Sequence, residues 1–257
     1  MGSTRMKIDL NCDMGEGFGP WVMGHDSDLL ECVTSANIAC GFHAGDPMIM
    51  LETCRRAVKH GVAIGAHPGF DDKQGFGRRR ILGLSSREVE TLVAYQIGAL
   101  QAVARLAGGS VTHVKAHGAL SNMACEDERM ASAIARAIHQ VDRELVFVVM
   151  PFTELETAGK VSGLTLVREV FADRGYEDNG LLMPRHEPGA VLQDEDEIAD
   201  RVLEMVRTQS IPTRSGRTLR TPIDTICLHG DTPGALTIAH TIRSLCREAG
   251  VAVKAFV

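Results

Sequence analysis

The stretch SANIACGFHAGDP, residues 35–47, constrains the fold of this chain more than any other. Residues 36–40 form a short, nearly apolar run, which is typical of a strand buried on both faces. Polar residues, among them His43, follow at once. Pro47 suits the first position of a helix, with Asp46 as its N-cap, because proline lacks only a backbone N–H that would have no partner there. The stretch therefore predicts a strand, a polar loop and a helix, in that order.

The same order recurs along the chain. Strands are expected at residues 6–11, 36–40, 62–66, 112–116, 145–150, 164–171 and 224–228, with a last short strand within 251–257. Helices are expected at 48–60, 85–107, 127–141, 194–209 and 232–250, and irregular segments at 68–83, 175–194 and 207–222. Parallel strands joined by right-handed crossovers all point the same way, so their carboxyl ends share one face.

Nearly every predicted strand ends in polar residues, which favours a closed barrel over an open doubly wound sheet. A barrel gathers all the strand ends around one mouth, whereas an open sheet binds ligands at its switch point. We therefore expect a single α/β domain, a (β/α)7-type barrel, over residues 1–257. Residues 1–5 are expected to form a tail outside the fold.

Charge and cysteine content narrow the class of partner. The formal net charge of -6 and the pI near 5.9 argue against nucleic acid or an acidic membrane as the main partner. Seven scattered cysteines without a C-x-x-C pair suit reduced thiols. No run approaches the roughly 18 apolar residues of a membrane helix, and no signal peptide is visible. We expect a cytoplasmic protein whose partners are small solutes or proteins.

Side chains able to do chemistry follow the predicted strands. These are Asp13, His43, His67, His117, His229 and Asp231, with Lys115 one step inside its strand. A single histidine at the end of a strand more often has a structural role, with a hydrogen bond to a backbone carbonyl, than a functional one. Four histidines at the ends of different strands favour a functional site at the mouth of the barrel. Such a mouth can hold a divalent metal, or it can bind an anion while transferring protons. The spacing does not choose between the two.

Cationic residues point to an anionic ligand. Lys115 lies among apolar strand residues, a costly position unless its ammonium meets a carboxylate or a phosphate. Arg78, Arg79 and Arg80 can clamp phosphate, although such a run is more often a solvated face. The sequence has no G-x-x-x-x-G-K-[ST] loop, so a nucleotide would bind without one. None of the cysteines has a nearby histidine in a known nucleophile pattern, apart from Cys40 near His43.

Six groups of residues together resemble the LamB/YcsF family. They are residues 9–16, 35–47, 65–68 with 75–79, 114–120, 172–176 and 227–232. The resemblance runs in order from about residue 7 to the C-terminus. The chain departs from the family pattern at Ala116, where proline is usual, at Ser121, where tyrosine is usual, and at Asp71, where proline is frequent.

The resemblance implies a seven-stranded barrel similar to the glycoside hydrolase/polysaccharide deacetylase type, and an activity that opens 5-oxo-L-proline to L-glutamate. It also implies ATP, with Mg²⁺, as co-substrate and two further subunits, B and C; a homo-oligomer is left open. A lactam is a poor electrophile, and phosphorylation of its amide oxygen turns that oxygen into a leaving group. Such chemistry needs cationic side chains that bind the phosphate and a base that deprotonates the attacking water.

The candidate site residues follow from this chemistry. Catalytic candidates are Asp13, His67, Lys115, His117 and Asp231. Candidates for contact with substrate or phosphate are Asn11, Glu16, Asn37, His43, Arg78, Arg79, Arg185 and His229. A divalent metal in the mouth would use Asp13, His67 and His117. Two alternative functions stay open, a metal-dependent deacetylase-like hydrolase of an amide or N-acyl carbohydrate and a non-catalytic partner that regulates other subunits.

Overall fold

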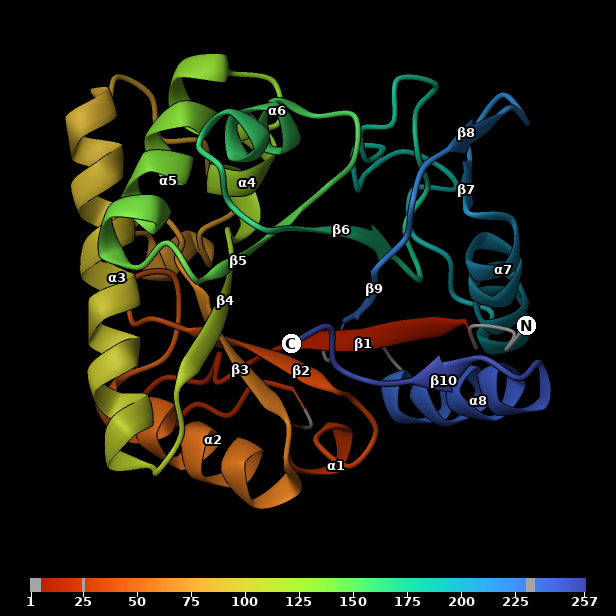
Figure 1. The fold of residues 1–257 in the computed structure, drawn as a ribbon, viewed down its shortest axis with the longest axis horizontal. Coiled ribbons are helices and arrows are strands. Elements are labelled where there is room, and N and C mark those ends of the chain that lie inside the picture. The colour runs from red at the N-terminus through yellow and green to blue at the C-terminus, as the bar shows by residue number, and fades with distance from the viewer. Residues whose placement is uncertain (1–5, 25, 230–233) are drawn as a thin grey trace.

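The computed structural model describes residues 6–24, 26–229 and 234–257. Within these ranges seven parallel strands form a closed ring, because the last of them pairs with both the sixth and the first (Figure 1). They are β1 (Lys7–Met14), β2 (Ser35–Ala39), β3 (Ala63–His67), β4 (Val111–Lys115), β5 (Val146–Val149), β6 (Leu166–Phe171) and β9 (Thr225–Leu228). The predicted seven-stranded α/β barrel is confirmed. The expected tail, residues 1–5, lies outside the described residues.

Helices surround the barrel. They are α1 (Asp26–Leu29), α2 (Pro47–His60), α3 (Ser86–Leu106), α4 (Gly118–Ala124), α5 (Glu128–Val141), α6 (Glu154–Val161), α7 (Glu195–Thr208) and α8 (Ala235–Glu248), with a 3-10 turn at Lys73–Gly75. In Figure 1, α2, α3 and α5 cover one side of the ring, and α7 packs beside α8 on the other. Apolar side chains of the helices and the strands form one continuous core between the two layers.

Two predicted helix starts are confirmed in detail. Asp46 accepts hydrogen bonds from the backbone N–H groups of Met48 and Ile49, at 2.9 and 3.0 Å, directly before Pro47. The Ser85 side chain accepts from the N–H of residue 88, whose carboxylate accepts from the N–H of Ser85 in return. These caps satisfy backbone groups that the first helical turn leaves unpaired.

The segment 207–222, which was expected to be an irregular connector, instead contains an antiparallel hairpin. Its strands are β7 (Ser210–Pro212) and β8 (Thr218–Arg220). Three residues are too few to show a period of two, and this is why the pattern does not reveal them. The expected C-terminal strand is present only as β10 (Ala252–Val253), which pairs with β1 outside the ring.

The C-terminal segment covers the amino ends of the strands. Phe256 packs against Val146, Val148 and Val167 at the start of β5 and β6. Its ring also meets the His113 ring edge to face, with centroids 5.1 Å apart. In Figure 1 the C-terminus accordingly lies among the strands. Solutes therefore reach the barrel from the opposite end, where the strands finish.

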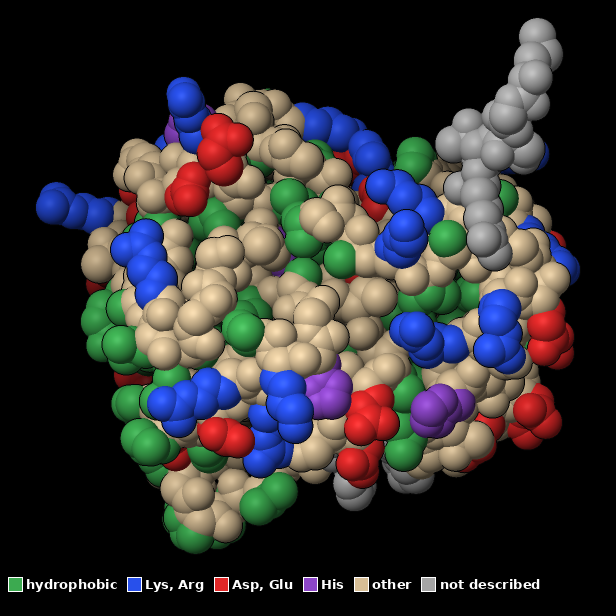
Figure 2. Space-filling model, turned by 60° about the horizontal axis from the view of Figure 1, so that its bottom comes forward, with side chains coloured by type: hydrophobic (Ala, Val, Ile, Leu, Met, Phe, Trp, Pro, Cys, Tyr) green, Lys and Arg blue, Asp and Glu red, His purple; other side chains and the backbone are tan. Residues whose placement is uncertain are grey.

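The surface is that of a mixed-charge protein. Figure 2 shows acidic and basic side chains interspersed over the visible face, without a large area of one sign. In the described ranges, no helix combines the length and the apolar composition that a bilayer crossing requires.

Asp9, a buried carboxylate of β1, lies deep in the barrel wall. Its carboxylate accepts hydrogen bonds from the hydroxyls of Thr34, at 2.6 Å, Ser35, at 2.7 Å, and Thr225. Burial raises the pKa of Asp9 to about 6, although these hydroxyls act to lower it. The charged form of Asp9 is therefore costly in the folded state, and the neutral form is not.

This raised pKa predicts a contribution of Asp9 to stability that falls with rising pH. Between about pH 4 and pH 6 the folded chain binds a proton at Asp9 that the unfolded chain has lost, so Asp9 by itself lowers the free energy of unfolding by about 2–3 kcal/mol over that range. The buried histidines with lowered pKa values contribute in the opposite direction, so the effect is read as the difference between the wild type and a variant at Asp9. Asp9→Asn, which mimics the neutral acid, should remove this decrease. Urea unfolding midpoints across that range measure it, with the exposed Asp200→Asn as control. Equal pH dependence in the wild type and in Asp9→Asn would contradict the assignment.

Candidate functional site

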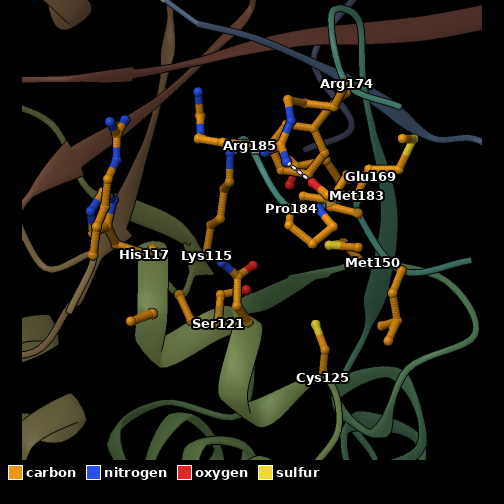
Figure 3. Close-up of a pocket in the computed structure, with 18 of the residues that line it drawn as sticks. Lys115, His117, Ser121, Cys125, Met150, Glu169, Arg174, Met183, Pro184 and Arg185 are labelled. Atoms are coloured by element: carbon orange, nitrogen blue, oxygen red, sulfur yellow. Dashed lines mark hydrogen bonds and ion pairs between the residues drawn. The ribbon is translucent and has the colours of Figure 1, made fainter. Parts of the chain in front are cut away.

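A cavity of about 580 Å³ opens where the barrel strands end. Its lining includes Asp13, His67, Lys115, His117 and His229, which lie far apart in the sequence. Figure 3 shows Lys115, Glu169, Arg174 and Arg185 facing the same space, with Ser121 and Cys125 of the α4 region on its lower side. The barrel brings the polar strand ends together because parallel strands deliver their carboxyl ends to one face.

Lys115, the last residue of β4, is bound between two carboxylates. Its ammonium lies 2.8 Å from Glu169 Oε1 and 3.0 Å from Asp13 Oδ1. Burial would lower the pKa of Lys115, but the charges of Asp13 and Glu169 hold it well above its ordinary value. The same ammonium lies 3.1 Å from Cys227 Sγ, and burial raises the pKa of that thiol well above its usual range. A cation is therefore fixed at the floor of the cavity.

Two buried asparagines hold Asp13 in place. Asn37 Nδ2 donates to Asn11 Oδ1 at 2.7 Å and to Asp13 Oδ1 at 2.9 Å. Burial would raise the pKa of Asp13, but His67 and Lys115 hold it well below its ordinary value, so Asp13 is ionised. Asn11 and Asn37, predicted to contact substrate, lie beneath the cavity and support its floor.

Three histidines and Glu16 form a second cluster at the rim. Donor atoms of Glu16, His43, His67 and His117 all lie within 4.8 Å of one another. The rings of His43 and His117 stack with centroids 3.7 Å apart. Burial lowers the pKa of His117 to about 3 and that of His43 well below its usual range, and the neighbouring rings act in the same direction. Both rings are therefore neutral near pH 7, the form in which imidazole binds metals.

Gly77 allows the loop after β3 to close over this cluster. Its φ of +62° is a conformation that glycine adopts without strain. A Cβ at this position would lie 2.6 Å from the Cβ of His43 and 2.9 Å from the His117 ring. The closed loop places the carbonyl of Phe76 within 2.8 Å of His117 Nε2.

Asp173 and His229 form a dyad on the other side of the cavity. His229 Nδ1 lies 2.7 Å from Asp173 Oδ1, and Nε2 lies 3.4 Å from an Arg185 nitrogen. Burial would raise the pKa of Asp173, but the interaction with His229 keeps it below its ordinary value. The ionised carboxylate fixes the His229 proton on Nδ1, which leaves Nε2 able to accept one. Arg201 of α7 donates to the backbone carbonyls of residues 171, 172 and 174 and so holds this turn.

Three arginines contribute positive charge to a cavity lining that also contains the carboxylates of Glu126, Glu177 and Glu187. These arginines are Arg78, Arg174 and Arg185. Arg174 is anchored by hydrogen bonds to the carbonyls of residues 183 and 190, and burial lowers its pKa to about 10, so it stays charged. Arg79 does not reach the cavity, because it pairs with Asp72 within its own loop. Convergent guanidinium groups of this kind bind phosphate or carboxylate.

Sequence reasoning omitted some residues of this site. Glu169 is a carboxylate inside an apolar strand, the same signal that marks Lys115. Asp173 and Arg174 follow the strand ending at 171 and belong to the family motif, yet they were not among the candidates. Asp231, a predicted catalytic residue, lies outside the described residues. Burial raises the pKa of the Cys40 thiol to about 12, so Cys40 is not a thiolate nucleophile.

Comparison with known proteins gives consistent results. A family model described as the LamB/YcsF family matches residues 8–257. A protein of Rhodopseudomonas palustris (strain BisA53), named as the A subunit of 5-oxoprolinase, is 58% identical over 249 residues, which are 97% of this chain and 98% of that protein. The solved structure of a lactam utilization protein from Thermus thermophilus is 45% identical, with a TM-score of 0.92, and the match covers 98% of this chain and 100% of that one.

A more distant likeness concerns the fold alone. The solved structure of a GH113 β-1,4-mannanase is 11% identical with a TM-score of 0.51, over 93% of this chain and 100% of that one. It agrees with the expected barrel of glycoside hydrolase type.

Proposed function

The chain belongs to the LamB/YcsF family, and from this membership we propose that it is the A subunit of an ATP-dependent 5-oxoprolinase. The enzyme would cleave 5-oxo-L-proline to L-glutamate while ATP is hydrolysed to ADP and phosphate. The single observation that carries this proposal is the 58% identity, over nearly the full length of both chains, with a protein that bears the name of that subunit. ATP, with Mg²⁺, is the co-substrate of the complex, and subunits B and C are the partners.

The cavity suits an activated lactam. The phosphorylated lactam is anionic, because it carries the carboxylate of 5-oxoproline and a phosphoryl group on the lactam oxygen. The cavity presents positive charge to both groups from Arg78, Arg174, Arg185 and Lys115. Phosphorylation converts the lactam oxygen into a leaving group, so that water can add to the ring carbon. This chemistry explains why a hydrolase would place its cations on the wall and floor of one cavity.

The dyad of Asp173 and His229 supplies the base. Nε2 of His229 faces the cavity and takes a proton from the attacking water, while Asp173 stabilises the imidazolium that forms. When the C–N bond of the ring breaks, the same imidazolium returns a proton to the ring nitrogen, and the former ring carbon is left as an acyl phosphate. A second water then displaces the phosphate from this carbon and gives the side-chain carboxylate of glutamate. Lys115, fixed by Asp13 and Glu169, stabilises negative charge that develops on the oxygen of the ring carbon.

Reconstitution tests the proposal. The purified chain is mixed with subunits B and C, and glutamate release from 5-oxoproline is measured with and without ATP, and with each component left out. We expect glutamate only in the complete, ATP-containing mixture. Absence of glutamate from that mixture would falsify the proposal. ATP-independent release of acetate from an N-acetylated sugar would support the deacetylase-like alternative instead.

A further inference from the structure

The lining of the cavity contains more carboxylates than cations. Six acidic and four basic side chains, histidines aside, line it: Asp13, Glu16, Glu126, Glu169, Glu177 and Glu187 against Arg78, Lys115, Arg174 and Arg185. Lys115 binds two of these carboxylates at the floor. A cleft attracts an ion through the summed charge of its walls, so the other carboxylates weaken the binding of an anion unless further cations compensate them.

Arg214 supplies such a cation to two of these carboxylates. It lies in residues 213–217, the turn of the hairpin that β7 and β8 form, and the described lining of the cavity does not include it. Its Nη1 atom lies 3.1 Å from Glu177 Oε1 and 2.9 Å from Glu187 Oε2. Arg214 is exposed, whereas both glutamates are half-buried. One guanidinium thus binds two carboxylates of the cavity wall from the solvent side.

The same turn holds the cavity wall through contacts that do not involve the Arg214 side chain. The backbone N–H of Arg214 donates to the carbonyl oxygen of Tyr176 at 2.8 Å. The hydroxyls of Thr213 and Ser215 each donate to Asp178 at 2.7 Å. The hairpin accordingly lies beside this segment in Figure 1. Loss of the guanidinium alone therefore leaves the wall fastened, so the effect of its charge can be measured separately.

The charge of Arg214 matters for a ligand because of Arg185. Arg185 precedes Glu187 by two residues, and it faces the cavity in Figure 3. Without the Arg214 guanidinium, Glu177 and Glu187 would place two negative charges without this partner on the wall that presents Arg185. Opposite charges close together cancel much of each other's field, so that wall would attract an anion less strongly.

We propose that Arg214 is a positioning residue for anion binding, which acts through Glu177 and Glu187. By pairing with both carboxylates it leaves the positive charge of the cavity wall available to a small anionic ligand, without touching that ligand itself. The inference rests on the proposed function for the identity of the ligand, which carries the carboxylate of 5-oxoproline. The ion pairs that support it do not depend on that function.

Binding of 5-oxoproline to the purified chain tests the inference without reference to turnover. Isothermal titration calorimetry at low ionic strength gives the dissociation constant. We expect Arg214→Gln to weaken binding about 5–10-fold, because two carboxylates of the wall lose their partner. Added salt should reduce the difference between this variant and the wild type, since salt screens charges near the surface.

Further variants separate the charge of Arg214 from a structural role. Adding Glu177→Gln and Glu187→Gln to Arg214→Gln removes the two carboxylates that have lost their cation, and should restore the affinity to within about 2-fold of the wild type. A structural defect would not be repaired in this way. Arg220→Gln, at an exposed arginine of β8 in the same hairpin, is the matched control and should leave the affinity unchanged. Circular dichroism checks that each variant folds.

Three results would overturn the inference. They are an unchanged affinity in Arg214→Gln, a loss of affinity that the two glutamine substitutions do not restore, and a wild-type chain that does not bind 5-oxoproline. Failure of the complete complex to release glutamate would refute the proposed function, and it would leave these dissociation constants and their interpretation as they are.

Discussion

Lys115→Met should lower the rate of glutamate release by the reconstituted complex about 10²–10³-fold, with a small change in the KM for 5-oxoproline. The ammonium of Lys115 is held by Asp13 and Glu169 at the floor of the cavity, where burial strengthens its effect on developing negative charge. Methionine keeps most of the length of the side chain and removes the ammonium, with its charge and its hydrogen-bond donors. Steady-state glutamate formation at saturating ATP measures the loss.

The same substitution also removes the partner of two buried carboxylates. Breaking such a pair costs about 3–5 kcal/mol of stability, so loss of fold must be separated from loss of catalysis. Adding Glu169→Gln to Lys115→Met removes one unpaired charge and should recover part of the stability without recovering activity. The exposed Lys59→Met serves as the matched control. A folded Lys115→Met chain with nearly wild-type turnover would show that this cation takes no part in the reaction.

His229→Gln should lower kcat about 10²–10⁴-fold, the range for loss of a positioned general base. Asp173→Asn should have a similar effect for another reason. The side-chain amide of that variant would donate to Nδ1, so the neutral ring would carry its proton on Nε2 and could not accept one from water.

The separate effects on kcat and KM make this test specific. Loss of a base lowers kcat with little change in the KM for 5-oxoproline, whereas a merely structural role for Asp173 or His229 would change KM and the unfolding temperature as well. His186→Gln, at an exposed histidine of the same loop region, is the control. A folded His229→Gln chain with nearly wild-type kcat would refute the assignment of His229 as the base.

The barrel could be predicted from the sequence because its signals are local. A buried parallel strand such as β5 (Val146–Val149) is a short apolar run, and every one of its residues is buried. The caps at Asp46 and Ser85 depend on side chains within three residues of the helix start. The hairpin of β7 and β8 lacks such a signal, because its strands are short and its stability comes from contacts elsewhere in the fold.

The candidate site could be predicted only in part. Polar residues after strands are visible one by one, but which of them meet depends on strand order around the ring. Lys115 and Glu169 are two strands apart in that order, and their pairing follows from the closed barrel, not from their spacing in the chain. For the same reason the sequence indicates histidines at the mouth but not the tautomers of His67 and His117, which backbone carbonyls of distant segments determine.

The most direct measurement compares complexes that differ only at the floor and wall of the cavity. Wild-type chain and the double variant Lys115→Met, His229→Gln are each assembled with subunits B and C, and ATP-dependent glutamate release is followed once co-purification shows that the complex has formed. If the ring opens in this cavity, the assembled double variant releases no more glutamate than a mixture from which the chain is left out. Release near the wild-type rate would place the chemistry outside this barrel.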